Sequence, residues 1–291
     1  TAFGVFLGHM MNATMLKGCG EALYHIMGLG NPFLWSVLVM LSSLFVTRGN
    51  VYNKLETVMK ILLATMTICF VGLALASHPD PVEIVGGVFA FSMPEGTGIF
   101  GALMLTVSLV GAVAGSLTNF MYPLSMREKG WVDASYKKIQ RNELLFSTIM
   151  LIILNLTMWI VGAEILRPAG IEVKALEDIS MALEMNFGAV GRIVFYLGVF
   201  GALYSTVLGV ANGYSLIVIE NIHIYKPERA KKYGPVMEHD PIYKYLALFY
   251  LITPLVWSLP GLPDFVVLTL IANMFNTVAL PAIAIGLLAL T

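Results

Sequence analysis

The chain has 291 residues, of which 58% are hydrophobic and only 12% are charged, and its formal net charge is −1 at pH 7. A soluble domain carries roughly 25% charged residues, so this composition argues against a soluble enzyme or binding module and indicates a polytopic membrane protein. Basic residues form no continuous tract, which argues against a nucleic-acid partner. The lipid bilayer is the expected environment.

Long apolar segments recur along the chain and predict its membrane-spanning helices. Most approach the ~20 residues that a helix needs to cross the hydrocarbon layer, although 32–47 and 242–258 are shorter. In chain order the segments are 2–28, 32–47, 53–76, 98–125, 143–166, 190–222, 242–258 and 264–290. We therefore expect an all-α polytopic membrane protein with about eight transmembrane helices in a single transmembrane domain, 1–291.

The loops between these segments alternate in charge. Cytoplasmic loops of membrane proteins carry an excess of Lys and Arg. Here the basic loops are 47–54, 126–142 and 225–244, whereas the loops between them are acidic or nearly neutral. We expect the basic loops to be cytoplasmic, so that the first segment runs from inside to outside.

Three of the loops have further features. Loops 77–97 and 167–189 are long enough for short helices at the membrane surface, and "SMALEMNFGAVG" predicts one that ends on Gly188. The cytoplasmic stretch "YKPERAKKYGPVMEHDP" is interpreted as a solvated linker. His239 and Asp240 within it could bind a metal, but a surface turn before Pro241 is the stronger interpretation.

The first segment carries four polar residues inside an apolar run: Asn12, Thr14, Lys17 and Glu21. Lys17 and Glu21 are four residues apart and share one face of a helix. Charged groups are costly in hydrocarbon, so they indicate a polar pathway or water path through the bundle. A purely structural ion pair is an equally good interpretation.

Small and polar residues interrupt three later segments. "GAVAGSLTN", 111–119, favours either a helix break that exposes carbonyl oxygens or close packing between helices. In "GALYSTVLGVANGYS", Tyr204 and Ser205 face either a cavity or a packed neighbour. In "IANMFNTVALP", Asn273 and Asn276 share a face and form either interhelical hydrogen bonds or ligands for a hard cation.

Motifs of enzymes are missing from the chain. It contains no phosphate loop, no Gly-x-Ser-x-Gly elbow, no His-x-x-x-His pair and no cysteine pair at metal-ligand spacing. Cys19 and Cys69 lie in apolar runs and are interpreted as small hydrophobic residues. The sequence therefore does not indicate an enzyme.

The order of the segments resembles the Nramp (natural resistance-associated macrophage protein) family of divalent metal transporters. The resemblance rests on "GNPFLWSVLVMLSSLFVTRGNVYNKLE", "SLVGAVAGSLTNFMYPLSMREKGW", "GALYSTVLGVANG" and "NMFNTVALP". It covers nearly the whole chain and implies family spans three to ten, as a fragment from which the first two spans and the C-terminal end are missing. It also implies a LeuT-type inverted-repeat fold, incomplete here, with a helix broken near 111–119.

Matched residue by residue, the resemblance implies an ion site formed by the Val113 carbonyl, Ser116, Thr118, Asn119 and Asn273. Ser116 replaces a family Met, and a hydroxyl favours harder cations than a thioether does. This pattern resembles the magnesium-transporting relatives, which places Mg²⁺ ahead of Mn²⁺.

Three further departures bear on coupling and completeness. The family's His is Thr118, and its acidic pair in the third span falls on Thr14 and Lys17, so these departures weaken the implication of proton coupling and leave coupled and uncoupled transport open. The family's Asp-Pro-Gly-x-Asn motif belongs to the first span. Half of the ion site is therefore expected outside this sequence, which should not transport alone.

The resemblance implies a secondary transporter that moves a divalent metal cation by alternating access, with the ion as cargo and no resident cofactor. A permease for amino acids or other organic substrates on the same fold is the first alternative, and a non-transporting membrane scaffold is the second. The expected location is the bacterial inner (plasma) membrane, and the expected state is a monomer.

Overall fold

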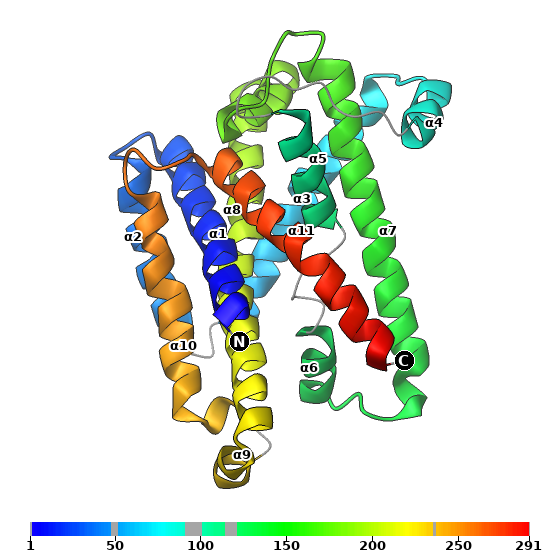
Figure 1. The fold of residues 1–291 in the computed structure, drawn as a ribbon. Helices are drawn as coiled ribbons and strands as arrows, with labels where there is room; N and C mark the ends of the chain where they lie inside the picture. Colours follow the sequence, from blue (N-terminus) through cyan, green and yellow to red (C-terminus); the bar gives the residue numbers. More distant parts are fainter. Residues whose placement is uncertain (1, 48–51, 91–100, 114–120, 235–236, 291) are drawn as a thin grey trace.

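The computed structural model describes residues 2–47, 52–90, 101–113, 121–234 and 237–290, and the regular elements in these ranges are all helical (Figure 1). The α-helices are α1 (Ala2–Met27), α2 (Pro32–Val46), α3 (Tyr52–Ala76), α4 (Pro81–Phe89), α5 (Ala102–Val113), α6 (Met121–Glu128), α7 (Lys137–Val161), α8 (Leu176–Tyr225), α9 (Pro227–Tyr233), α10 (Pro241–Ile252) and α11 (Phe265–Leu290). Shorter turns are η3 (Ala134–Tyr136), the π-helical η4 (Gly162–Leu166), η5 (Met237–His239) and η6 (Thr253–Ser258).

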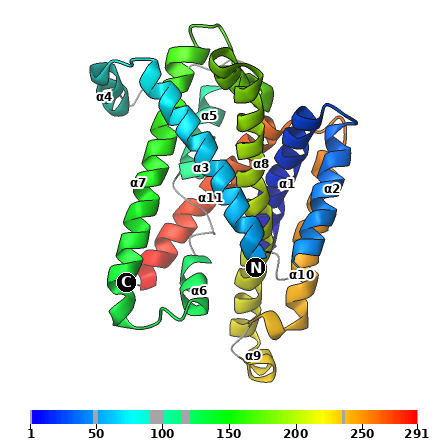
Figure 2. The ribbon, with the colours of Figure 1, turned by 180° about the vertical axis from the view of Figure 1, so that it is seen from behind.

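Helix α8 forms the centre of the bundle, with α1 and α3 packed along it (Figures 1 and 2). Its buried residues form the core with α1, α2 and α10, and this core includes the free thiol of Cys19, as expected of a small hydrophobic residue. The helix breaks near its start at Gly188, whose φ of 61° favours glycine. The predicted short helix that ends on Gly188 is therefore confirmed.

Three helices begin with the same local signal, an Asn or Asp followed by Pro. The side chains of Asn31, Asp80 and Asp240 each accept a hydrogen bond from a backbone N–H in the first turn of α2, α4 and α10. Such caps satisfy amide groups that have no partner inside the helix, and Pro at the first position loses no hydrogen bond. Helix α4 also confirms the short helix expected in loop 77–97.

The outer surface of the bundle fits a bilayer. Within the described residues four helices are long and apolar enough to cross a membrane, and the count reaches five if the bent pair α1–α2 forms one span. Helix α7 buries only Thr157 and Val161 and exposes the rest of its apolar surface, as a lipid-facing helix does. A polytopic membrane protein is thus supported, while the number of eight spans stays a prediction.

Two of the predicted basic loops lie at one end of the bundle. The end of α6, the start of α7 and α9 share the lower end in Figure 1, whereas the α1–α2 turn, α4 and the start of α8 lie at the upper end. This arrangement agrees with the alternation of loop charge in the sequence.

The last turn of α5 packs directly on α11. Gly111 is buried, and a Cβ added there would collide with the carbonyl oxygen of Asn273. The hydroxyls of Ser108 and Thr277 donate across the interface to backbone carbonyls at 2.8 and 2.6 Å. The structure therefore favours close packing at Gly111, and this packing holds the end of α5 beside Asn273.

The stretch 225–241, expected to be a solvated cytoplasmic linker, forms α9 and η5 in its described residues, and the surface turn predicted before Pro241 is wrong. Asp240 is fully buried (0% exposed). Its carboxylate accepts hydrogen bonds from Arg229 Nη2 at 2.6 Å and Nε at 3.1 Å, and lies 3.0 Å from His223 Nε2. A carboxylate with this many partners can be buried. In the described ranges no three His, Cys, Asp or Glu side chains gather as a metal site.

These contacts change the pKa of Asp240. Burial alone would raise the pKa, but the hydrogen bonds from Arg229, the Ile242 N–H and His223 outweigh it and lower the pKa from 3.8 to about 2. Because the folded-state pKa lies below the unfolded one, the carboxylate contributes stability above the unfolded pKa. This contribution is lost as pH falls through the folded pKa.

We expect Asp240→Asn to lose about 2 kcal/mol of unfolding free energy near neutral pH, and its deficit against the native protein to shrink as pH falls from about 4 to 2. Thermal unfolding in detergent micelles at a series of pH values measures this. Asp133→Asn is the matched control, because Asp133 is exposed and makes no cap hydrogen bond. A deficit for Asp240→Asn that stays constant down to pH ~2 would contradict the assignment.

Candidate functional site

The predicted ion-site segment lies between α5 and α6. Val113 is the last residue of α5, and its side chain is exposed. Ser116, Thr118 and Asn119 lie outside the described residues. On either side of them, α5 packs on α11 and α6 packs on α8. The predicted segment is therefore bounded by helices that rest on two different partners.

Helix α11 supplies an unpartnered polar atom in the interior. Asn276 is only 2% exposed, and its Nδ2 donates to Met11 Sδ at 3.3 Å. Its Oδ1 is buried and has no hydrogen-bond partner among the described residues. A buried oxygen without a donor costs free energy unless water or a cation binds it. Asn276 is therefore a candidate ligand for a hard cation, and the Oδ1 of Asn12 is likewise buried without a partner among the described residues.

Pro281 frees a second oxygen atom on the same helix, the backbone carbonyl oxygen of Thr277. It stands inside α11 and has no N–H, so the carbonyl of Thr277 lacks its usual intrahelical donor. In a membrane helix such a carbonyl needs another partner within the protein, a water molecule or an ion. Thr277 directly follows Asn276, so two adjacent residues each carry an oxygen atom that can bind a cation.

No pattern in the sequence singled out Met11, the partner of Asn276. Its only signal was its spacing of three residues from Thr14, which put both on one helical face. The Thr14 hydroxyl donates to the Met11 carbonyl at 2.7 Å and therefore satisfies itself within α1. The thioether of Met11 accepts the amide hydrogen of Asn276, and the amide oxygen of that side chain has no partner among the described residues.

The other polar residues of α1 bind the backbone of neighbouring elements. Asn12 Nδ2 donates to the Tyr250 carbonyl at 2.6 Å. Four residues after Tyr250 stands Pro254, which has no N–H and cannot complete the helical hydrogen bond. Helix α10 ends at Ile252 and continues as η6. Asn12 thus replaces a hydrogen bond that the chain loses at Pro254.

Lys17 and Glu21 bind opposite kinds of helix end. Lys17 Nζ donates to the carbonyls of Trp257 and Leu262 at 3.2 and 3.4 Å, at and beyond the end of η6. Glu21 accepts a hydrogen bond from the N–H of Phe265, the first residue of α11, at 3.1 Å. Cations suit carbonyl ends and carboxylates suit amide ends. In the described part of the chain the two side chains form no ion pair with each other.

A small cavity lies beside these charges. It has a volume of about 230 Å³, and Lys17, Glu21 and Asp264 are among its lining residues. Its lining holds two carboxyl groups beside one ammonium group, and carboxyl oxygens favour the approach of cations. It lies at the end of the bundle where α1, α2 and the connection between η6 and α11 meet.

The polar residues of α8 are engaged in packing. Tyr204 is 3% exposed, and its hydroxyl lies 2.9 Å from Ser42 Oγ of α2. Ser205 donates to the carbonyl of Ala202 in its own helix at 2.9 Å. These contacts favour the packed interpretation of this segment over the cavity-facing one.

A known protein family accounts for this arrangement. The family model described as natural resistance-associated macrophage protein-like (Nramp) matches residues 2–291. The chain belongs to the Nramp family. It is therefore a divalent metal transporter and a multi-pass integral membrane protein, not an enzyme, and its fold is LeuT-like. No curated protein matches the chain.

The role of Asn12 in this Nramp protein is testable by a double-mutant cycle with Pro254. We expect Asn12→Leu to cost about 1–3 kcal/mol of unfolding free energy, because it leaves the Tyr250 carbonyl buried without a donor. In a Pro254→Ala background the restored N–H can donate to that carbonyl, so the same substitution should cost less. Chemical unfolding in detergent measures all four proteins. Equal losses in both backgrounds would show that Asn12 does not replace the missing hydrogen bond.

Proposed function

We propose that this Nramp protein transports a hard divalent cation, with Mg²⁺ ahead of Mn²⁺, by alternating access. The observation that carries the proposal is the buried and unpartnered Oδ1 of Asn276. Amide and carbonyl oxygens are ligands for hard cations, and Mg²⁺ combines a few of them with retained waters. Ser116 supplies a hydroxyl where the family has a thioether, which supports the same preference.

The ion or its water shell contacts two groups of residues in this proposal. The first is the segment after α5, with the Val113 carbonyl, Ser116, Thr118 and Asn119. The second is the facing part of α11, with Asn273 and Asn276. The packing of Gly111 on the Asn273 backbone supports the pairing, because it holds the end of α5 against this turn of α11.

Transport without proton movement is the second part of the proposal. A proton path needs groups that bind and release protons, and the family's acidic pair is represented here by Thr14 and Lys17. Thr14 donates to its own helix, and Lys17 is held by two backbone carbonyls. Neither residue offers a carboxylate. The polar residues of α1 serve the helix packing, and Lys17 and Glu21 line the small cavity together with Asp264 from the connection before α11.

The proposed orientation places the basic loops 47–54, 126–142 and 225–244 in the cytoplasm of a bacterial cell, with the protein in the inner membrane as a monomer. Its support is that the end of α6, the start of α7 and α9, whose sequences carry Lys and Arg, lie at one end of the bundle (Figure 1). Cations concentrate on the cytoplasmic side of membrane proteins.

The test uses the full-length protein in proteoliposomes that contain a pH-sensitive dye. We expect Mg²⁺ to enter without acidification, and Asn276→Leu to slow its entry by at least about tenfold, because a direct ligand is lost. Asn155→Leu is the matched control, since Asn155 is exposed on α7 and donates to the Leu151 carbonyl of its own helix. Ser116→Met should shift the preference towards Mn²⁺.

Three outcomes would contradict the proposal. Acidification in step with Mg²⁺ entry would show proton coupling. Equal rates for Asn276→Leu and Asn155→Leu would remove Asn276 from the path of the ion. Uptake of an amino acid with no uptake of either metal would favour an organic-substrate permease.

A further inference from the structure

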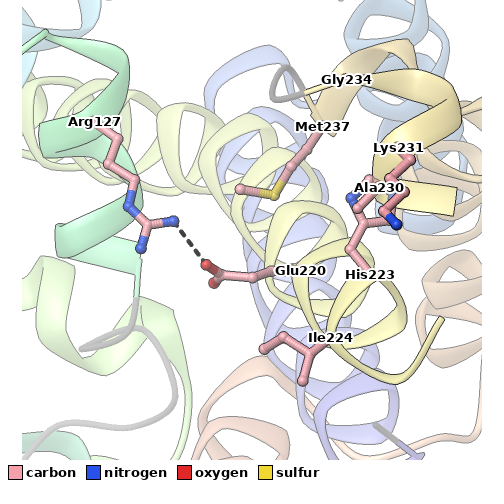
Figure 3. A pocket seen from close by; sticks show the side chains of 8 residues that line it. All are labelled: Arg127, Glu220, His223, Ile224, Ala230, Lys231, Gly234 and Met237. Carbon is pink, nitrogen blue, oxygen red and sulfur yellow. Dashed lines mark hydrogen bonds and ion pairs between the residues drawn. The ribbon is translucent and has the colours of Figure 1, made fainter. Parts of the chain in front are cut away.

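A second cavity lies at the opposite end of the bundle from the Lys17 cavity. It has a volume of about 530 Å³ and lies between α6, α8, α9 and η5 (Figure 3). Pockets of about 300–1,000 Å³ hold small organic ligands. It shares none of its lining residues with the proposed ion path.

The lining of this cavity carries two cations, Arg127 and Lys231, and one anion, Glu220. Arg127 pairs with Glu220 at 2.9 Å, and Arg229, which does not line the cavity, pairs with Asp240 at 2.6 Å. Lys231 lines the cavity and forms no ion pair in the part of the chain that the structure describes. Figure 3 shows Lys231 and His223 across the cavity from Arg127.

Residues beside the cavity are of the kinds found where a protein crosses the membrane surface. Ile224 and Tyr225 at the end of α8 are 68% and 79% exposed. Aromatic residues with exposed apolar neighbours gather where hydrocarbon meets water. Ile224 and Met237 give the cavity an apolar wall next to its cations (Figure 3). The cavity therefore presents cations and apolar surface together at the edge of the bilayer.

We propose that this cavity binds a phosphate-bearing anion, from either the headgroup of an acidic phospholipid or a soluble phosphate compound. Phosphate oxygens accept strong hydrogen bonds from Lys and Arg, and basic pockets between transmembrane helices suit lipid headgroups. Lys231 provides the unpaired charge. Arg127 provides a second cation, which is drawn away from Glu220 when the ligand binds.

The test uses the full-length protein in phosphatidylcholine nanodiscs, with separate lipid and soluble arms. In the lipid arm the discs contain phosphatidylglycerol, and native mass spectrometry counts the retained anionic lipid. In the soluble arm, equilibrium dialysis measures labelled inorganic phosphate and adenosine triphosphate. We expect binding in one arm, weakened about tenfold by Lys231→Gln because one charged hydrogen bond is lost. Ala230→Trp should abolish it by filling the cavity with no change of charge.

Lys138→Gln is the matched control, because Lys138 is an exposed cation of the same basic loops that does not line the cavity. It should bind like the native protein. Binding in the lipid arm alone identifies a headgroup, and binding in the soluble arm alone identifies a soluble compound. No binding in either arm, native binding by Ala230→Trp, or an equal loss for Lys138→Gln and Lys231→Gln would overturn the proposal.

Discussion

A bilayer offers no hydrogen bonds, so every backbone carbonyl that loses its helical partner has to find a donor inside the protein. In this chain that constraint acts where α10 gives way to η6. Pro254 removes the donor for the Tyr250 carbonyl, and the end of η6 leaves further carbonyls without partners. Asn12 and Lys17 of α1 supply the donors, although more than 200 residues separate them from these carbonyls. This pairing joins α1 to the α10–η6 junction, in addition to its packing along α8.

The candidate ion site depends on the same turn of α1. Met11 and Asn12 are neighbours that face different helices, since Asn12 binds α10 whereas Met11 accepts the amide of Asn276 from α11. The hydrogen bond that anchors α1 therefore also fixes the thioether that orients Asn276. From α11 the arrangement continues to α5 through Gly111, and α5 leads into the predicted ion-site segment. In this protein the contacts that pack the helices therefore also position the oxygen ligands.

The sequence predicts those parts of this fold that depend on local signals. Apolar length alone placed α2 within one residue of its observed ends, and the glycine at 188 marked the end of a short helix. Local sequence signals do not predict contacts between residues that are far apart in the chain. Nothing local to Asn12 indicates Tyr250, and nothing near Met11 indicates Asn276. Asp240 was misjudged for the same reason, because its burial depends on Arg229 and His223 reaching it from α9 and α8. Ser116, Thr118 and Asn119 stay predictions from family resemblance.

The most direct test of the central claim is the position of the metal itself. Crystals of the full-length protein grown with Mn²⁺ would give an anomalous signal at the ion, and added Mg²⁺ would displace it if both share one site. The account predicts a peak within coordination distance of Asn276 Oδ1, close to the end of α5, that excess Mg²⁺ removes. A peak only in the cavity of Glu21 and Asp264, with Asn276 Oδ1 hydrogen-bonded to protein, would contradict it.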